Sequence, residues 1–82
     1  MQNDSWKNCT PDGLPPVVNK EYIINHCRKG KFQGKVLNAD DTTWADVLIT
    51  HGKANTLLDY NIAEEGETVT VRSTLCTMIP VN

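Results

Sequence analysis

The sequence lacks the features that mark membrane-spanning, secreted or disulfide-rich proteins. No run approaches the ~18 consecutive apolar residues of a membrane-spanning helix. Residues 1–6 hold neither a basic cluster nor an apolar run, so no secretory signal is predicted. The chain has three cysteines, Cys9, Cys27 and Cys76. An odd number cannot all pair within one chain, so a closed disulfide framework is not expected. We therefore expect free thiols in a reducing cytoplasm, with a single bridge between two cysteines as the alternative.

Motifs of catalysis are also missing. The chain has no G-x-S-x-G elbow, no phosphate-binding P-loop and no H-E-x-x-H motif. His26 and Cys27 are adjacent, but consecutive side chains on a strand point to opposite faces and cannot pair as imidazole and thiolate. The carboxylate pairs Asp40–Asp41 and Glu64–Glu65 lie in hydrophilic turns, where no burial raises a pKa toward general-acid chemistry. We predict no enzyme activity and no catalytic residue, although a Cys–His pair drawn from two different strands stays open.

Spacings typical of metal sites do not occur. Zinc sites use C-x₂₋₄-C or closely paired histidines, and neither pattern is present. Five possible ligands are instead scattered along the chain: Cys9, Cys27, Cys76, His26 and His51. Unpaired cysteines are often small buried hydrophobes, the role expected for Cys27 and Cys76. We predict no metal and no cofactor.

The residues that are present describe one small, mostly-β domain. Eighty-two residues with 39% hydrophobic and 22% charged side chains are typical of a single folded unit with a thin core. β-Branched and aromatic runs alternate with turn-forming residues, and no apolar stripe of helical period appears. The pattern predicts an all-β or mostly-β chain: a five- to six-stranded SH3-like barrel, or a rolled antiparallel sheet. An irregular N-terminal arm over residues 1–16 would pack on a β domain over residues 17–82.

The expected strands follow from short runs of the sequence. Segments 17–27 and 32–39 flank a glycine-containing turn and predict a hairpin, with a bulge or sharp bend at Gly34. Segment 43–51 gives the strongest strand signal, with a short helix over 44–51 as the alternative. Segments 67–74 and 75–79 alternate in polarity as strands do. Segment 55–61 suits either a short strand or one helical turn.

Two tryptophans carry separate expectations. Trp6 lies in the polar arm, and we expect its indole to anchor that arm on the domain. Trp44 begins the strongest strand, and its size favours a central core position. If Trp44 points outward instead, it is the natural hot spot of a protein-binding surface.

Charge is divided unevenly along the chain. Residues 1–39 carry six basic and three acidic side chains, whereas residues 40–82 carry two basic and seven acidic ones. The acidic half predicts a protein-binding surface that steers a basic partner; its candidate residues are Asp40, Asp41, Trp44, Asp46, Glu64, Glu65 and Glu67. The basic half offers an alternative, weak binding of single-stranded nucleic acid at the first hairpin; its candidate residues are Lys20, Arg28, Lys29, Lys31, Phe32 and Lys35.

The two ends of the chain resemble those of a known group of proteins. Trp6 is followed by Leu14-Pro15-Pro16-Val17 and then by a strand, a glycine-containing turn and a second strand. This opening resembles small accessory proteins of tailed bacteriophages and prophages, in which Trp and Pro-Pro-Val-Gly open a β domain. Val18 replaces the glycine, and the ending over 77–81 only approximates the Phe-Arg-Pro-Ile-like close of that group.

The resemblance implies a phage-type accessory protein acting in the bacterial cytoplasm, and it carries over no activity. We accordingly expect binding of a host or phage protein, with no membrane association. A virion structural or self-associating subunit is a further alternative, in which exposed strand edges pair between copies.

Overall fold

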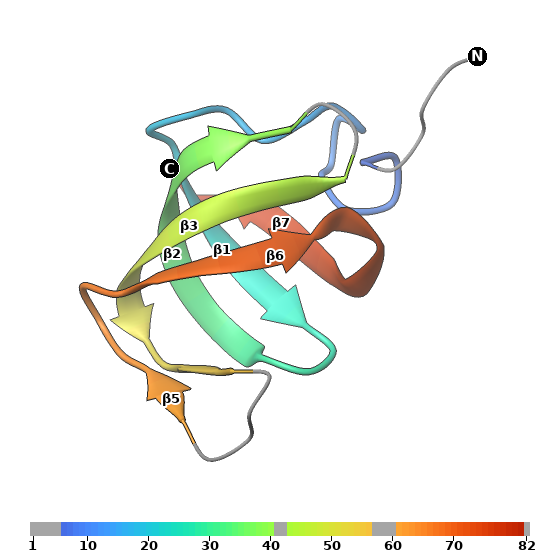
Figure 1. Ribbon diagram of the computed structural model, residues 1–82. Helices are drawn as coiled ribbons and strands as arrows, with labels where there is room; N and C mark the ends of the chain where they lie inside the picture. Colours follow the sequence, from blue (N-terminus) through green and yellow to red (C-terminus); the bar gives the residue numbers. More distant parts are fainter. Residues whose placement is uncertain (1–5, 41–42, 57–60, 82) are drawn as a thin grey trace.

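The computed structural model describes residues 6–40, 43–56 and 61–81, and strands dominate them. Five strands form one antiparallel sheet in the order β6–β3–β2–β1–β7 (Figure 1). They are β1 (Glu21–His26), β2 (Gly30–Ala39), β3 (Trp44–Gly52), β6 (Thr68–Arg72) and β7 (Cys76–Pro80), and a second, two-stranded sheet pairs β4 (Ala54–Asn55) with β5 (Ile62–Ala63).

The helical content of the described residues is a single 3₁₀ turn, η1 (Ser73–Leu75). The mostly-β prediction is therefore confirmed. None of the described segments forms a helix with the length and hydropathy needed to cross a lipid bilayer.

The strands form where the sequence alternates between apolar and polar side chains. In β3, Ala45, Val47 and Ile49 are buried while their neighbours are partly or fully exposed. This period of two is that of a strand with one buried face, so the helix alternative for this segment is wrong. The predicted hairpin of β1 and β2 is confirmed, with Glu21 opposite Lys35 and His26 opposite Gly30.

The large sheet is curled rather than flat. A flat sheet of five strands would hold its edges about 19 Å apart, since strands are spaced by about 4.8 Å. The edge strands β6 and β7 are joined only by η1, and the four-residue step from Arg72 to Cys76 spans at most about 14 Å. The sheet must therefore roll to bring its edges toward each other, as Figure 1 shows. No ladder joins β6 to β7 in the described residues, so the closed form of the predicted barrel is not found there.

Gly34 lies at a bend in the long strand β2. The pairing of β2 with β3 changes register between Gln33 and Gly34, and again between Val36 and Asn38. The bulge predicted at Gly34 is thus confirmed. A Cβ atom at this position would overlap Val47 Cγ1 and lie 2.8 Å from the carbonyl oxygen of Leu48. Glycine is needed here because the backbones of β2 and β3 approach closely at the bend.

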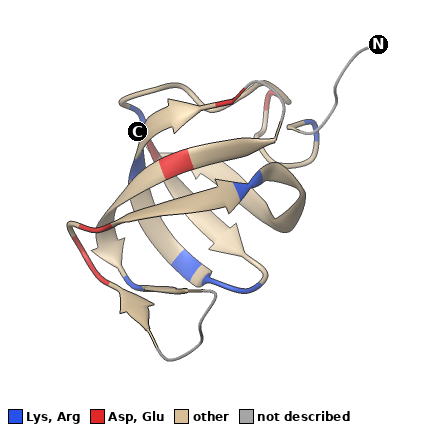
Figure 2. Ribbon diagram, in the orientation of Figure 1, with Lys and Arg blue, Asp and Glu red and all other residues tan. Residues whose placement is uncertain are grey.

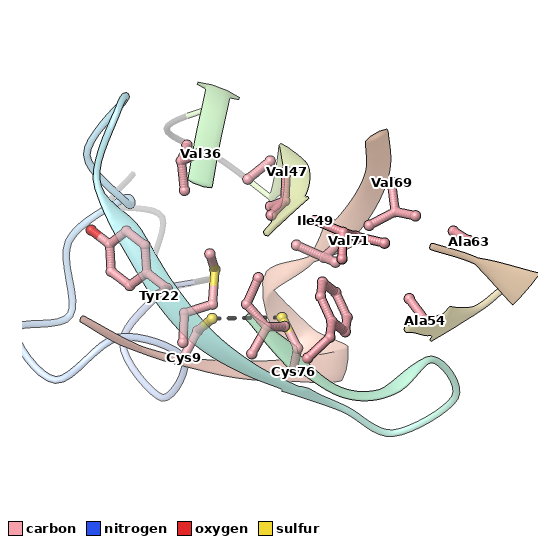
Figure 3. Packing of buried hydrophobic residues seen from close by; sticks show 14 of the residues in the cluster. Cys9, Tyr22, Val36, Val47, Ile49, Ala54, Ala63, Val69, Val71 and Cys76 are labelled. Atoms are coloured by element: carbon pink, nitrogen blue, oxygen red, sulfur yellow. Dashed lines mark hydrogen bonds between the residues drawn. The ribbon is translucent and has the colours of Figure 1, made fainter. Parts of the chain in front are cut away.

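The core lies inside the roll and includes the N-terminal arm (Figure 3). Trp6 is only 2% exposed, and its indole Nε1 donates a hydrogen bond to the Asp40 carbonyl oxygen at 3.0 Å. Cys9 is also buried, and its carbonyl oxygen accepts a hydrogen bond of 2.7 Å from the amide of Met78 in β7. The arm therefore covers part of the β7 edge and contributes side chains to the same core as the strands.

Candidate functional site

The predicted acidic surface is spread along β3 and β6 and does not form one cluster. Asp46 lies on β3, where its Oδ1 accepts a hydrogen bond of 2.6 Å from the Thr70 hydroxyl of β6. Asp40 lies at the start of β3, where its amide bonds the Trp44 carbonyl oxygen, and Asp41 is outside the described residues. The turn Glu64–Glu67 lies at the opposite end of β3, beside Ile49 (Figure 2).

Two carboxylates of that turn also have structural roles. Glu67 Oε1 accepts a hydrogen bond of 2.8 Å from the Glu64 amide, which closes the turn. Glu65 Oε2 accepts one of 3.3 Å from the amide of Gly52 at the end of β3. Reversing these charges would therefore remove hydrogen bonds of the fold as well as negative charge. Asp46 is the better probe of surface charge.

Trp44 lies on the outer surface of the sheet. It begins β3, is 37% exposed, and is paired across strands with Arg72 of β6. The expected core position is therefore wrong, because the alternation of β3 puts Ala45 inside and its predecessor outside. The outward alternative holds: a large indole is presented next to Asp46, on the pair β3–β6, and no other strand of the described residues pairs with the outer edge of β6.

The predicted basic surface divides into two parts. Arg28, Lys29 and Lys31 surround the turn between β1 and β2, whereas Lys20 and Lys35 lie at the other end of that hairpin. Five ladder steps of about 3.4 Å put the two parts about 17 Å apart. Phe32 is 3% exposed and belongs to the core, so its ring does not face solvent for stacking on a base. Its place in the nucleic-acid set is wrong because β2 turns that side chain into the roll.

The structure adds residues that the sequence did not single out. Arg72, at the end of β6, joins Arg28 and Lys29 around a hollow of about 180 Å³. We call this the basic hollow; its lining is completed by His26, Thr70 and Leu75. Arg72 is 43 residues beyond Lys29 and lies in the acidic half of the chain. No local pattern could have grouped these side chains, because the rolling of the sheet brings β6 to the β1–β2 turn.

His26 lines this hollow and is held by the backbone of the β1–β2 turn. The residue is only 5% exposed, and its Nδ1 accepts hydrogen bonds of 3.0 and 3.1 Å from the amides of Arg28 and Lys29. An accepting Nδ1 is unprotonated, so the proton of the neutral ring is on Nε2. Burial, followed by the charges of Lys29 and Arg28, lowers the pKa of His26. His26 is therefore neutral at pH 7, with Nε2–H as its donor.

We expect the free energy of unfolding to fall as the pH drops below 6.5. The unfolded chain takes up a proton at His26 near the ordinary pKa of 6.5, whereas the folded chain resists it to lower pH. Stability is thus fully present above pH 6.5 and is lost progressively down through the folded-state pKa. Urea unfolding of the wild type and of His26→Asn, whose amide oxygen can still accept the two backbone bonds, measures this at pH 7.5 and 5.

The variant should lose less stability than the wild type between those two pH values. Equal losses would contradict the prediction. Glu21 also makes the stability depend on pH, because hydrogen bonds from Gln33 and Thr50 lower its pKa from 4.5. Measurements at pH 5 and above exclude the titration of Glu21, so the change in stability reports on His26. Because that shift is downward, Glu21 favours the fold above pH 4.5 and loses its effect at lower pH.

The three cysteines lie at one end of the sheet. Cys9 Sγ and Cys76 Sγ are 3.8 Å apart in the core, and Cys27 is exposed (Figure 3). His26, the last residue of β1, is buried, whereas Cys27 lies in the turn that follows and is exposed. The burial expected of Cys76 is confirmed, and that expected of Cys27 is wrong because the strand ends before it. His26 is instead paired across strands with Cys76. The hydrogen bond with Cys9, followed by burial, raises the pKa of Cys76, so Cys76 is a protonated thiol rather than an activated nucleophile.

The described residues contain no group of three His, Cys, Asp or Glu side chains close enough to hold a metal ion. Comparison of the chain with protein-family models, with curated proteins and with solved structures finds no match. The candidate surfaces are therefore argued from the chain's own geometry. They are the outer face of β3 and β6 around Trp44, and the basic hollow beside it.

Proposed function

We propose that this chain is a non-enzymatic accessory protein that binds a protein partner through the outer face of β3 and β6. The observation that carries the proposal is the exposure of Trp44, in a domain that buries its other tryptophan almost completely. A solvent-facing indole costs hydrophobic free energy in the isolated chain, and tryptophans are the most enriched residues at binding hot spots. Asp46, close by on the same face, would orient a basic partner.

The edge of β6 supports the same proposal. β6 pairs with β3 on one side, and no second strand of the described residues pairs with its other side. A free edge presents backbone donors and acceptors to an incoming strand. The partner would therefore contact Trp44 and Asp46 with side chains and the edge of β6 with its backbone.

For the architecture, we propose a small SH3-like roll in open form. The supporting features are the five-stranded order with consecutive strands β6 and β7 at opposite edges, and the 3₁₀ turn that joins them. The arm from Trp6 onward would complete the roll by covering the β7 edge through Cys9.

The resemblance of both chain ends to phage accessory proteins suggests the setting. The partner would then be a host or phage protein in the bacterial cytoplasm, and binding would modulate a host process. Nucleic-acid binding is the weaker candidate, because Phe32 is buried and the basic residues are split between two ends of the hairpin.

Affinity capture with matched variants tests the protein-binding proposal. Immobilised wild type is compared with Trp44→Ala, Asp46→Asn and Ile79→Ala, and captured proteins are identified by mass spectrometry and then titrated as purified partners. Trp44→Ala should weaken binding about 30-fold, the loss of a hot spot of about 2 kcal/mol. Asp46→Asn keeps an acceptor for Thr70 but removes the charge, and should mainly slow association at low salt.

Ile79→Ala is the control for loss of exposed apolar surface, since Ile79 is solvent-facing on β7 at the opposite edge of the sheet. It should bind as the wild type does. Capture that survives Trp44→Ala unchanged would contradict the proposal. Light scattering of the purified chain tests the self-associating alternative, in which β6 edges pair between copies and the mass exceeds that of one 9.1 kDa chain.

A further inference from the structure

The basic hollow carries an inference that goes beyond protein binding. Three of its six lining residues, Arg28, Lys29 and Arg72, are cations, and none of the six is acidic. The cations come from two distant segments, the β1–β2 turn and the end of β6, which Figure 2 shows on the same side of the molecule. The tertiary fold, and not proximity in the sequence, therefore brings the three cations together.

In the part of the chain that the structure describes, these cations have no charged partner. Within residues 6–40, 43–56 and 61–81, Arg28, Lys29 and Arg72 have no carboxylate oxygen within the 4.0 Å of an ion pair. Thr70, which lines the hollow, donates its hydroxyl hydrogen bond to Asp46 on β3. Like charges held together without a counter-charge repel one another, and an anion in the hollow would relieve that repulsion.

His26 gives the hollow a fixed neutral donor. Its buried ring is locked by the amides of Arg28 and Lys29, so the tautomer with Nε2–H is set by the backbone. The described residues provide no hydrogen-bond acceptor to Nε2. Two guanidinium groups, an ammonium group and an imidazole N–H together supply donors for several oxygens of one anion.

We propose that the basic hollow binds one tetrahedral oxyanion of the phosphate class, carried by inorganic phosphate or a small phosphate ester. At about 180 Å³ the hollow is smaller than the roughly 300 Å³ at which pockets for whole drug-sized ligands begin, so it takes one group. Guanidinium groups match a phosphate with paired, parallel hydrogen bonds, which gives Arg28 and Arg72 their role.

An extended nucleic-acid strand fits this surface less well. Lys20 and Lys35 are at the far end of the hairpin, and Asp46 and the acidic turn Glu64–Glu67 lie along the neighbouring strands. A polyanion would meet these negative charges after one or two phosphates. A single bound group avoids them.

Titration of the purified chain with inorganic phosphate tests the proposal. Backbone and arginine side-chain NMR signals are followed at pH 7, with sodium chloride holding the ionic strength constant. We expect saturable shifts at His26, Arg28, Lys29 and Arg72, and a rise in the pKa of His26 when phosphate is bound. Arg72→Gln should weaken binding about 10-fold or more, as expected for a lost hydrogen bond to a charged group.

Lys53→Gln is the matched control, because Lys53 is exposed and does not line the basic hollow. It makes the same change in net charge and should alter the affinity less than about twofold. Arg72→Gln should unfold in phosphate-free buffer at the same temperature as the wild type or higher, since it removes one of three repelling charges. An unchanged or higher unfolding temperature would show that the weaker phosphate binding of Arg72→Gln is not caused by unfolding of the variant.

Three results would overturn the proposal: shifts that grow without saturating, equal weakening by Arg72→Gln and Lys53→Gln, or single-stranded DNA binding that depends on Lys20 and Lys35 and exceeds phosphate binding. The affinities for inorganic phosphate and for a phosphate monoester such as glycerol phosphate are then compared, which shows which of the two sources the hollow prefers. The readout involves no protein partner, so it is independent of the proposed function.

Discussion

Replacing Gly34 with alanine should destabilise the domain by about 3 kcal/mol or more, enough to leave much of the chain unfolded. The added Cβ would overlap Val47 Cγ1 and lie 2.8 Å from the Leu48 carbonyl oxygen. Overpacking a closely packed site costs about 1–3 kcal/mol and sometimes more, and a core of this size supplies only about 3–5 kcal/mol in total. Urea unfolding followed by circular dichroism measures the loss, and Gly34→Val should not fold.

A double variant separates the two contacts behind this prediction. Val47→Ala removes the overlapping methyl group, so Gly34→Ala should cost less in the Val47→Ala background than in the wild type. It should not become neutral, because the Leu48 carbonyl belongs to the backbone of β3 and cannot move without disturbing the ladder. Wild-type stability for the single variant Gly34→Ala would show that the two strands do not approach as closely as described.

Oxidation should join Cys9 to Cys76 and stabilise the fold by about 4 kcal/mol. Their Sγ atoms are 3.8 Å apart and must close to about 2.05 Å, a small movement for two side chains in one cluster. The cysteines are 67 residues apart, so the bridge would close most of the chain into one loop and restrict the unfolded state. It would also attach the arm covalently to β7.

The exchange with a small disulfide such as oxidised glutathione has a defined order. The hydrogen bond with Cys76 lowers the pKa of Cys9, so Cys9 is the more acidic thiol of the pair; as the thiolate it attacks and releases one glutathione thiolate. Cys76 then gives up its proton to solvent, attacks the Cys9 sulfur of the mixed disulfide and releases the second glutathione. The protein is oxidised by two electrons, and the glutathione disulfide is reduced by two.

Thermal unfolding before and after oxidation measures the effect. A gain of about 4 kcal/mol should raise the Tm by at least about 15 °C in a domain of this size. Cys27→Ser is the control and should keep the gain, since Cys27 is outside the buried pair. Cys9→Ser should abolish the gain. A bridge that includes Cys27, found by peptide mapping, would contradict the prediction.

The sequence was a good guide to local structure and a poor guide to the surface. The hairpin, the bend at Gly34 and the strand over β3 follow from alternation and glycine placement, which depend on near neighbours. The place of a tryptophan or phenylalanine depends on which of two faces the roll encloses. The size of Trp44 therefore predicts a core position and the charged neighbours of Phe32 predict an exposed one, whereas in the structure Trp44 is exposed and Phe32 is buried.

By itself the sequence determined a small, mostly-β domain whose strands, turns and bulge at Gly34 are encoded in short segments. Only the tertiary structure decided which distant residues meet. A three-residue link between strands at opposite edges compels the sheet to roll. Rolling brings Arg72 to Arg28 and Lys29, and the folded-back arm brings Cys9 to Cys76. These long-range contacts depend on the path of the whole chain, so short sequence patterns cannot predict them.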